Sequence, residues 1–117
     1  MDMAATIRSV PEFPVEGILF YDITSIVKNP GALRASINRL VERYQDQDIE
    51  LVVGMESRGF IFGMPLAYQL DVGFVPIRKP GKLPAESIAE NYDLEYGTNT
   101  LEIHVDAIEK GQKVLIV

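Results

Sequence analysis

The chain contains no cysteine, which excludes disulfide bonds and thiolate metal sites. It also lacks any apolar run near the roughly 20 residues that a membrane-spanning helix needs. Its first ten residues include Asp2 and Arg8 and have no long apolar core, unlike a secretory signal. Together these absences predict a cytoplasmic protein that is not embedded in a membrane.

Positive charge is also scarce. Eleven Lys and Arg residues face seventeen Asp and Glu residues, and the net charge is -6 at pH 7. A general nucleic-acid binder usually presents a basic face, so this balance disfavours that class. Three of the cations nevertheless fall within five positions, at Arg78, Lys79 and Lys82. Such a cluster on an acidic protein indicates a small anionic ligand, with a solvated turn as the alternative.

What the chain does contain is typical of a folded domain. Its 117 residues are 47% hydrophobic and 24% charged, near the globular average, and predict one domain over residues 1–117. Helices are predicted from Asn29-Pro30 to Tyr44 and over 58–70. Extended segments are predicted at 18–23, 49–54, 72–78, 101–105 and 113–117, with one short helical turn at 106–110. Alternating strands and helices predict an α/β fold with a mostly parallel sheet flanked by helices.

Residues 79–100 show little amphipathic order. Long irregular stretches in compact domains are often lids or binding loops, so we predict a mobile lid or arm over residues 80–100. The alternative is an extended hairpin arm, because Tyr92, Leu94 and Tyr96 alternate as on one face of a strand.

Two loops carry residues suited to chemistry. The run GMESRG at 54–59 follows a predicted strand and opens a predicted helix, where backbone N–H groups favour an anion. Ser57 adds a hydroxyl, and Arg58 adds a planar cation suited to phosphate oxygens. The run IRKPGKLP at 77–84 follows the next strand, so both loops should lie at the same end of the sheet and together neutralise a diphosphate. The alternative is that Gly and Ser serve only the geometry of the turn.

Two further polar features have simpler interpretations. Asp93 and Glu95 are two positions apart and would share one face of a strand as solvated charge. His104, the only histidine, lies in an alternating apolar run and is predicted to be structural.

Four motifs occur in one order: FPVEGILFYDIT at 13–24, GMESRGFIFG at 54–63, IRKPGKLP at 77–84 and YDLEYG at 92–97. In this order and spacing they resemble the adenine phosphoribosyltransferases of the type I phosphoribosyltransferase family, over essentially the whole chain. The resemblance implies a homodimeric enzyme of purine salvage that makes AMP and pyrophosphate from adenine and phosphoribosyl pyrophosphate. It also implies an N-terminal hood segment over residues 1–30 that binds the base.

The resemblance assigns roles to individual residues. Backbone groups near Leu19, Phe20 and Tyr21 would bind the edge of adenine. The pyrophosphate would be held by Ser57 and Arg58 and faced by Arg78, Lys79 and Lys82. Glu95 would lie over the base and assist proton transfer, with Tyr96 beside it in the lid, so Glu95 and Arg58 are the predicted catalytic residues. Magnesium would bridge oxygens of the pyrophosphate and the ribose, with no metal ligand from the chain, and the Glu56–Ser57 peptide would be cis.

One part of the family pattern has no counterpart in the sequence. The family has an acidic pair and a Thr/Gly-rich phosphate loop directly after a strand like KVLIV, at 113–117 here. Residues 1–117 alone are therefore expected to be inactive. A non-catalytic purine- or nucleotide-binding relative, or a structural fragment, are the alternatives. Intact Arg58 and Glu95 favour the enzyme.

Overall fold

The computed structural model of the protein describes residues 2–94 and 97–117. The chain forms two compact units, Met1–Glu42 and Arg43–Val117, and each is described by itself. No helix within the described residues is long and apolar enough to cross a membrane.

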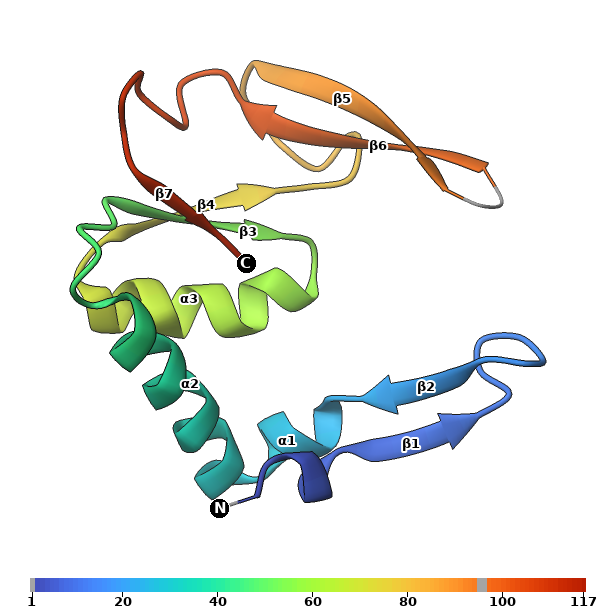
Figure 1. Cartoon of the computed structure of the whole chain (residues 1–117). Coiled ribbons are helices and arrows are strands. Elements are labelled where there is room, and N and C mark those ends of the chain that lie inside the picture. Colours follow the sequence, from blue (N-terminus) through green and yellow to red (C-terminus); the bar gives the residue numbers. More distant parts are fainter. Residues whose placement is uncertain (1, 95–96) are drawn as a thin grey trace. The chain divides into compact units, whose positions relative to one another are not determined.

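The N-terminal unit is a hairpin followed by helices (Figure 1). After the short 3-10 helix η1 (Ala4–Thr6), strands β1 (Arg8–Pro11) and β2 (Leu19–Asp22) pair antiparallel. Arg8 lies opposite Asp22 in this register, and Arg8 Nε is 3.3 Å from Asp22 Oδ2. The predicted extended segment at 18–23 is therefore confirmed. Strand β1 was not predicted, because its four residues show no clear alternation.

One of the two α-helices that follow this hairpin was predicted from the sequence and the other was not. Helix α2 (Pro30–Tyr44) confirms the predicted start, since the Asn29 Oδ1 atom accepts a hydrogen bond from the Ala32 N–H at 3.0 Å. Its buried residues are Ala32 and Ile37. Helix α1 (Thr24–Lys28) was not predicted, because five residues are too few to show a helical period.

The second unit is built on a parallel three-stranded sheet. Its strand order is β4 (Gly73–Ile77), β3 (Leu51–Met55) and β7 (Val114–Ile116), and both pairings are parallel. Helix α3 (Arg58–Leu70) connects β3 to β4 and lies along one face of the sheet (Figure 1). Four consecutive residues of β3 are buried, as expected for a central parallel strand with both faces covered. The α/β fold predicted from the sequence is confirmed.

Helix α3 covers the predicted range 58–70 and continues across Pro65. It ends at Leu70 and is followed by the C-cap residue Asp71, whose φ is 59°. The Val72 N–H donates to the Ala67 carbonyl at 3.0 Å. Leu66 and Ala67 are buried, and they hold the helix against the sheet.

The opposite side of the sheet carries a β-hairpin. Strands β5 (Ser87–Leu94) and β6 (Gly97–His104) pair antiparallel, which confirms the hairpin-arm alternative for this stretch. The segment at 101–105 is thus part of an arm and not a strand of the parallel sheet. The helical turn expected at 106–110 is wrong, since these residues form turns and bends. Ile103 packs against the buried cluster of Leu51, Val53 and Val75, so the base of the arm is part of the core.

Candidate functional site

The loop after β3 is tied to its neighbours on both sides. The Glu56 N–H donates to the Ile77 carbonyl at 2.9 Å, which joins the ends of β3 and β4. The Met55 N–H donates to the Val117 carbonyl at 3.2 Å, which joins β3 to the residue after β7. The Glu56–Ser57 peptide is cis, as predicted. The loop therefore lies at the carboxyl end of the sheet, where ligands bind in open α/β folds.

Both glycines of the GMESRG run are required by close packing. A Cβ atom at Gly59 would lie 2.5 Å from the Val117 carbonyl oxygen. A Cβ atom at Gly54 would lie 2.6 Å from the Phe74 ring and 2.7 Å from the Gly59 carbonyl oxygen. Real Cβ contacts are longer than this, so at these two positions glycine is required by the geometry of the turn.

A cavity of about 380 Å³ opens at this end of the sheet. It brings together Arg58, which is the first residue of α3, and Lys79, which lies in the loop after β4. The two predicted cationic loops therefore meet at one site. The cavity is lined by Met55, Glu56, Arg58, Gly59, Lys79, Tyr92, Leu101 and Val117. Two cations beside the N-terminus of a 13-residue helix form an environment suited to an anion.

Arg78 is paired with a carboxylate of the neighbouring loop. Its Nε donates to the Glu56 Oε1 atom at 2.8 Å, and its guanidinium lies 5.9 Å from the centre of the Phe60 ring. The Glu56 side chain is only 13% exposed. The hydrogen bond from Arg78 holds the pKa of the Glu56 carboxyl below its usual range, since it favours the charged form. Arg78 is not among the described residues that line the 380 Å³ cavity.

Glu56 is a site residue that sequence reasoning missed. The signal available in the sequence was a carboxylate two positions before Arg58, together with the cation Arg78 at the end of the next predicted strand. Ser57 and Lys82 are also absent from the described lining of the cavity. Ser57 precedes α3, and its carbonyl accepts a hydrogen bond from the Phe60 N–H at 3.0 Å. Lys82 is exposed on the loop between β4 and β5.

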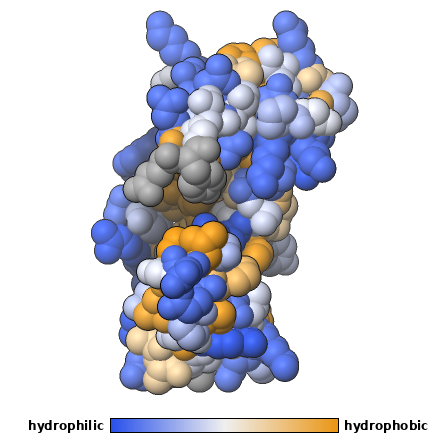
Figure 2. Space-filling view, turned by 90° about the vertical axis from the view of Figure 1, so that its right-hand side faces the viewer, coloured by the Kyte–Doolittle hydropathy of each residue, from blue (hydrophilic) through white to orange (hydrophobic). Residues whose placement is uncertain are grey.

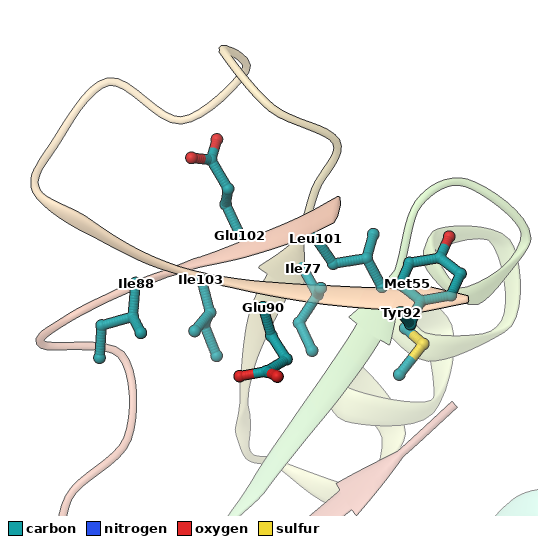
Figure 3. A pocket seen from close by; sticks show the side chains of 8 residues that line it. All are labelled: Met55, Ile77, Ile88, Glu90, Tyr92, Leu101, Glu102 and Ile103. Atoms are coloured by element: carbon teal, nitrogen blue, oxygen red, sulfur yellow. The ribbon is translucent and has the colours of Figure 1, made fainter. Parts of the chain in front are cut away.

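A second, more apolar cavity of about 540 Å³ lies beside the first, under the hairpin (Figure 3). The two cavities share Met55, Tyr92 and Leu101. The second is lined by Met55, Ile77, Ile88, Glu90, Tyr92, Leu101, Glu102 and Ile103. It was not predicted, because it depends on the hairpin lying over the end of the sheet.

The proposed adenine-binding residues belong to the N-terminal unit. Leu19 is 52% and Tyr21 61% exposed on β2, whereas Phe20 packs edge-to-face on Phe13 with ring centres 5.1 Å apart. Figure 2 shows hydrophobic residues gathered on the face that carries the loop between β1 and β2. The exposed side chains of this hairpin include Phe13, Val15, Ile18, Leu19 and Tyr21. They offer an apolar surface suited to a flat ring.

Asp93 and His104, the other polar residues singled out in the sequence, each accept a hydrogen bond. Glu95 and Tyr96 lie outside the described residues. The Asp93 Oδ1 atom accepts a hydrogen bond from the Thr98 hydroxyl at 3.3 Å. The His104 Nε2 atom accepts one from the Ala85 N–H at 3.3 Å, which agrees with a structural role. Within residues 2–94 and 97–117 there is no group of three acidic or histidine side chains placed to hold a metal ion.

Individual known proteins resemble the chain over nearly its whole length. No family model matches the chain. It is 59% identical over 117 residues to the adenine phosphoribosyltransferase of Acaryochloris marina, covering 100% of this chain and 69% of the relative. It is 60% identical over 111 residues to that of Psychromonas ingrahamii, covering 95% of this chain and 61% of the relative.

The structural comparison agrees. The crystal structure of adenine phosphoribosyltransferase from Thermoanaerobacter pseudethanolicus superimposes with a TM-score of 0.94 at 50% identity. The match covers 98% of this chain and 67% of that chain. This chain thus spans between 61% and 69% of the length of these three proteins. The likeness in sequence and the likeness in structure lead to one conclusion: the chain belongs to the adenine phosphoribosyltransferase family.

Proposed function

We propose that the protein transfers a phosphoribosyl group to adenine, making AMP and pyrophosphate in purine salvage. The observation that carries this proposal is the cavity in which Arg58 and Lys79 converge at the carboxyl end of β3 and β4. The family relatives named above support the choice of substrate, since each is an adenine phosphoribosyltransferase.

The chemistry requires fixed positive charge. Adenine displaces pyrophosphate from C1 of the ribose, and a cationic sugar develops while a highly charged group departs. Arg58 and Lys79 would stabilise this departing charge, and fixed cations do so best where water is excluded. Ser57 and Lys82 would make further contacts with the pyrophosphate. Arg78 would also face the pyrophosphate, through the guanidinium N–H groups other than the Nε–H that is hydrogen-bonded to Glu56.

Adenine would be bound by the N-terminal hood over residues 1–30, through backbone groups near Leu19, Phe20 and Tyr21. As a ring nitrogen forms its bond to C1, it must lose a proton. Glu95 would take up this proton as a general base, with Tyr96 beside it. Residues 80–100 would close over the site as a lid, which would exclude the water that hydrolyses an activated sugar.

Magnesium would enter with the donor. The oxygens of phosphoribosyl pyrophosphate are hard ligands of the kind that magnesium prefers, and the described residues supply no carboxylate cluster to compete for it. The ion would add positive charge beside that of Arg58 and Lys79. We further propose a cytoplasmic homodimer, and one domain over residues 1–117 that includes a base-binding hood at residues 1–30 and a lid or arm at residues 80–100.

The donor needs contacts at both of its ends. The described cavity serves the pyrophosphate end, and residues 1–117 contain no Thr/Gly-rich loop for the ribose 5-phosphate. We therefore propose that these 117 residues by themselves make little AMP. Correct positioning accounts for about 7–11 kcal/mol of a catalysed barrier, much of which would be lost.

The test is an assay of labelled adenine with phosphoribosyl pyrophosphate and magnesium, run on the full-length protein and on residues 1–117. AMP formation by the full-length protein and little by the segment is the expected result. Calorimetry with adenine and with pyrophosphate separates a non-catalytic binder from an enzyme. No binding of either ligand and no AMP from the full-length protein would refute the proposal.

A further inference from the structure

The part of the loop that carries the cations is anchored by Glu102 of the hairpin. Glu102 of β6 and Arg78 exchange two backbone hydrogen bonds, from the Arg78 N–H at 2.9 Å and from the Glu102 N–H at 2.7 Å. The Glu102 side chain adds a third bond, because its Oε1 atom accepts from the Gly81 N–H at 2.9 Å. Three hydrogen bonds thus connect one position of the arm to the loop between β4 and β5.

The direction of the Glu102 side chain is set by the strand. Neighbouring residues of a strand point to opposite faces, so Glu102 points away from the side chains of Leu101 and Ile103. Figure 3 shows this arrangement: the Glu102 carboxylate points toward the loop, while the Ile103 and Glu90 side chains point to the other side of the hairpin. A glutamate therefore occupies this position although its neighbours in the strand are apolar.

The bonded amide lies between the cations of the loop. Gly81 separates Lys79, which lines the 380 Å³ cavity, from Lys82. Its φ of +82° is one that only glycine adopts readily, so the turn has one specific shape. A hydrogen bond to a carboxylate is among the stronger kinds and fixes that shape. If the bond is removed, Lys79 and Lys82 are held less firmly.

We propose that Glu102 is a positioning residue for the pyrophosphate site: its carboxylate holds the Gly81 turn and thereby places Lys79 toward the anion. This inference rests on the proposed function. Glu102 itself would not touch the substrate. It would act through the loop, and it would connect the position of the β5–β6 arm to the placement of the cations.

Two rival explanations make different predictions. If Glu102 only lowers the local positive potential, then removing its charge strengthens pyrophosphate binding. If it only stabilises the fold, then its loss weakens the binding of adenine and pyrophosphate alike. The positioning role predicts a loss for pyrophosphate alone, and rescue by a side chain that keeps the hydrogen-bond acceptor without the charge.

The test is calorimetric binding of pyrophosphate with magnesium, and of adenine, to the full-length protein and its variants. Glu102→Ala should weaken pyrophosphate binding about five- to tenfold and leave adenine binding within about twofold, the effect of losing one charge-assisted bond at a partly exposed position. Glu102→Gln should stay within about twofold of the parent. Glu90→Ala is the matched control, since it removes a glutamate of the same hairpin whose side chain makes no hydrogen bond with the described residues.

Glu102→Asp keeps the charge but withdraws the carboxylate by about 1.5 Å, one carbon–carbon bond length, and should lose about threefold. It provides a second measurement if Glu102→Ala does not fold. Equal loss in Glu102→Gln and Glu102→Ala, tighter binding in either, or equal losses for adenine and pyrophosphate would overturn the proposal. If the parent itself does not bind pyrophosphate, the proposed function fails and this inference fails with it, whereas a parent that binds and an unaffected Glu102→Ala refute the inference alone.

Discussion

The ring of Phe74 fills space that two glycines leave open, and this makes Gly63 a sharp test of the packing. A Cβ atom at Gly63 on α3 would lie 2.8 Å from the Phe74 ring, and one at Gly54 on β3 would lie 2.6 Å from it. The same ring stands edge-on to Phe60, with centres 5.8 Å apart at 90°. We predict that Gly63→Ala destabilises the protein, although alanine is the better helix former.

Two opposing effects decide the magnitude. Replacing glycine by alanine in a helix interior gains about 0.8–1.0 kcal/mol. Carbon atoms pack best at about 3.5–4.0 Å, so the Phe74 ring would have to retreat by close to an ångström. The same ring atom, Phe74 Cε2, would lie 2.8 Å from a Cβ at Gly63 and 2.7 Å from one at Gly54, so both glycines border one edge of the ring. Overpacking of this kind costs about 1–3 kcal/mol, so the expected net loss is about 1 kcal/mol.

The assay is urea unfolding of the parent, Gly63→Ala, Phe74→Leu and the double variant, followed by circular dichroism. Phe74→Leu vacates part of the ring's space, so adding Gly63→Ala to it should stabilise by about the helix-propensity gain. A change of sign between the two backgrounds is the diagnostic result. If Gly63→Ala alone stabilised the parent by about 1 kcal/mol, the Phe74 ring would be free to move and the packing argument would be wrong.

Three further predictions concern the site and the core. The pKa of Glu56 is lowered in the folded protein, mainly by its hydrogen bond to Arg78. The stability from this pair should therefore be present above the ordinary pKa of a glutamate carboxyl and be lost as pH falls through the lower pKa of the folded state. Urea unfolding between about pH 3 and 7 should show a weaker acid dependence in Glu56→Gln, and an unchanged dependence would contradict this. Arg58→Ala in the full-length enzyme should lower kcat/KM for phosphoribosyl pyrophosphate about ten- to a hundredfold, with little effect on the KM for adenine. Steady-state kinetics that showed a change for adenine alone would show the assigned role to be wrong. Val53 is 2% exposed in β3, so Val53→Ala should lower the free energy of unfolding in urea by about 2–3 kcal/mol. A loss below about 0.5 kcal/mol would mean that neighbouring core side chains fill the space left by the two removed methyl groups.

The sequence by itself determined several of the local elements and the family. Helix α2 was predictable because Asn29 and Pro30 mark a helix start and apolar residues recur at helical spacing. Strands β3, β4 and β7 were predictable because buried parallel strands are short apolar runs. The order of the four motifs identified the family, as the relatives confirm. Such signals depend on residues that are close together in the sequence, so they can be recognised without the folded structure.

The tertiary structure alone decided which cation faces the cavity and which does not. Arg78 and Lys79 are adjacent in the sequence, yet Lys79 lines the cavity while Arg78 is hydrogen-bonded to Glu56, 22 positions earlier. The anchoring of Gly81 by Glu102 spans 21 positions and has no local signal. The second cavity likewise exists only because the β5–β6 hairpin lies over the end of the sheet. Such contacts join residues that are distant in sequence, and only the packed backbone determines which of the possible partners come within hydrogen-bond distance.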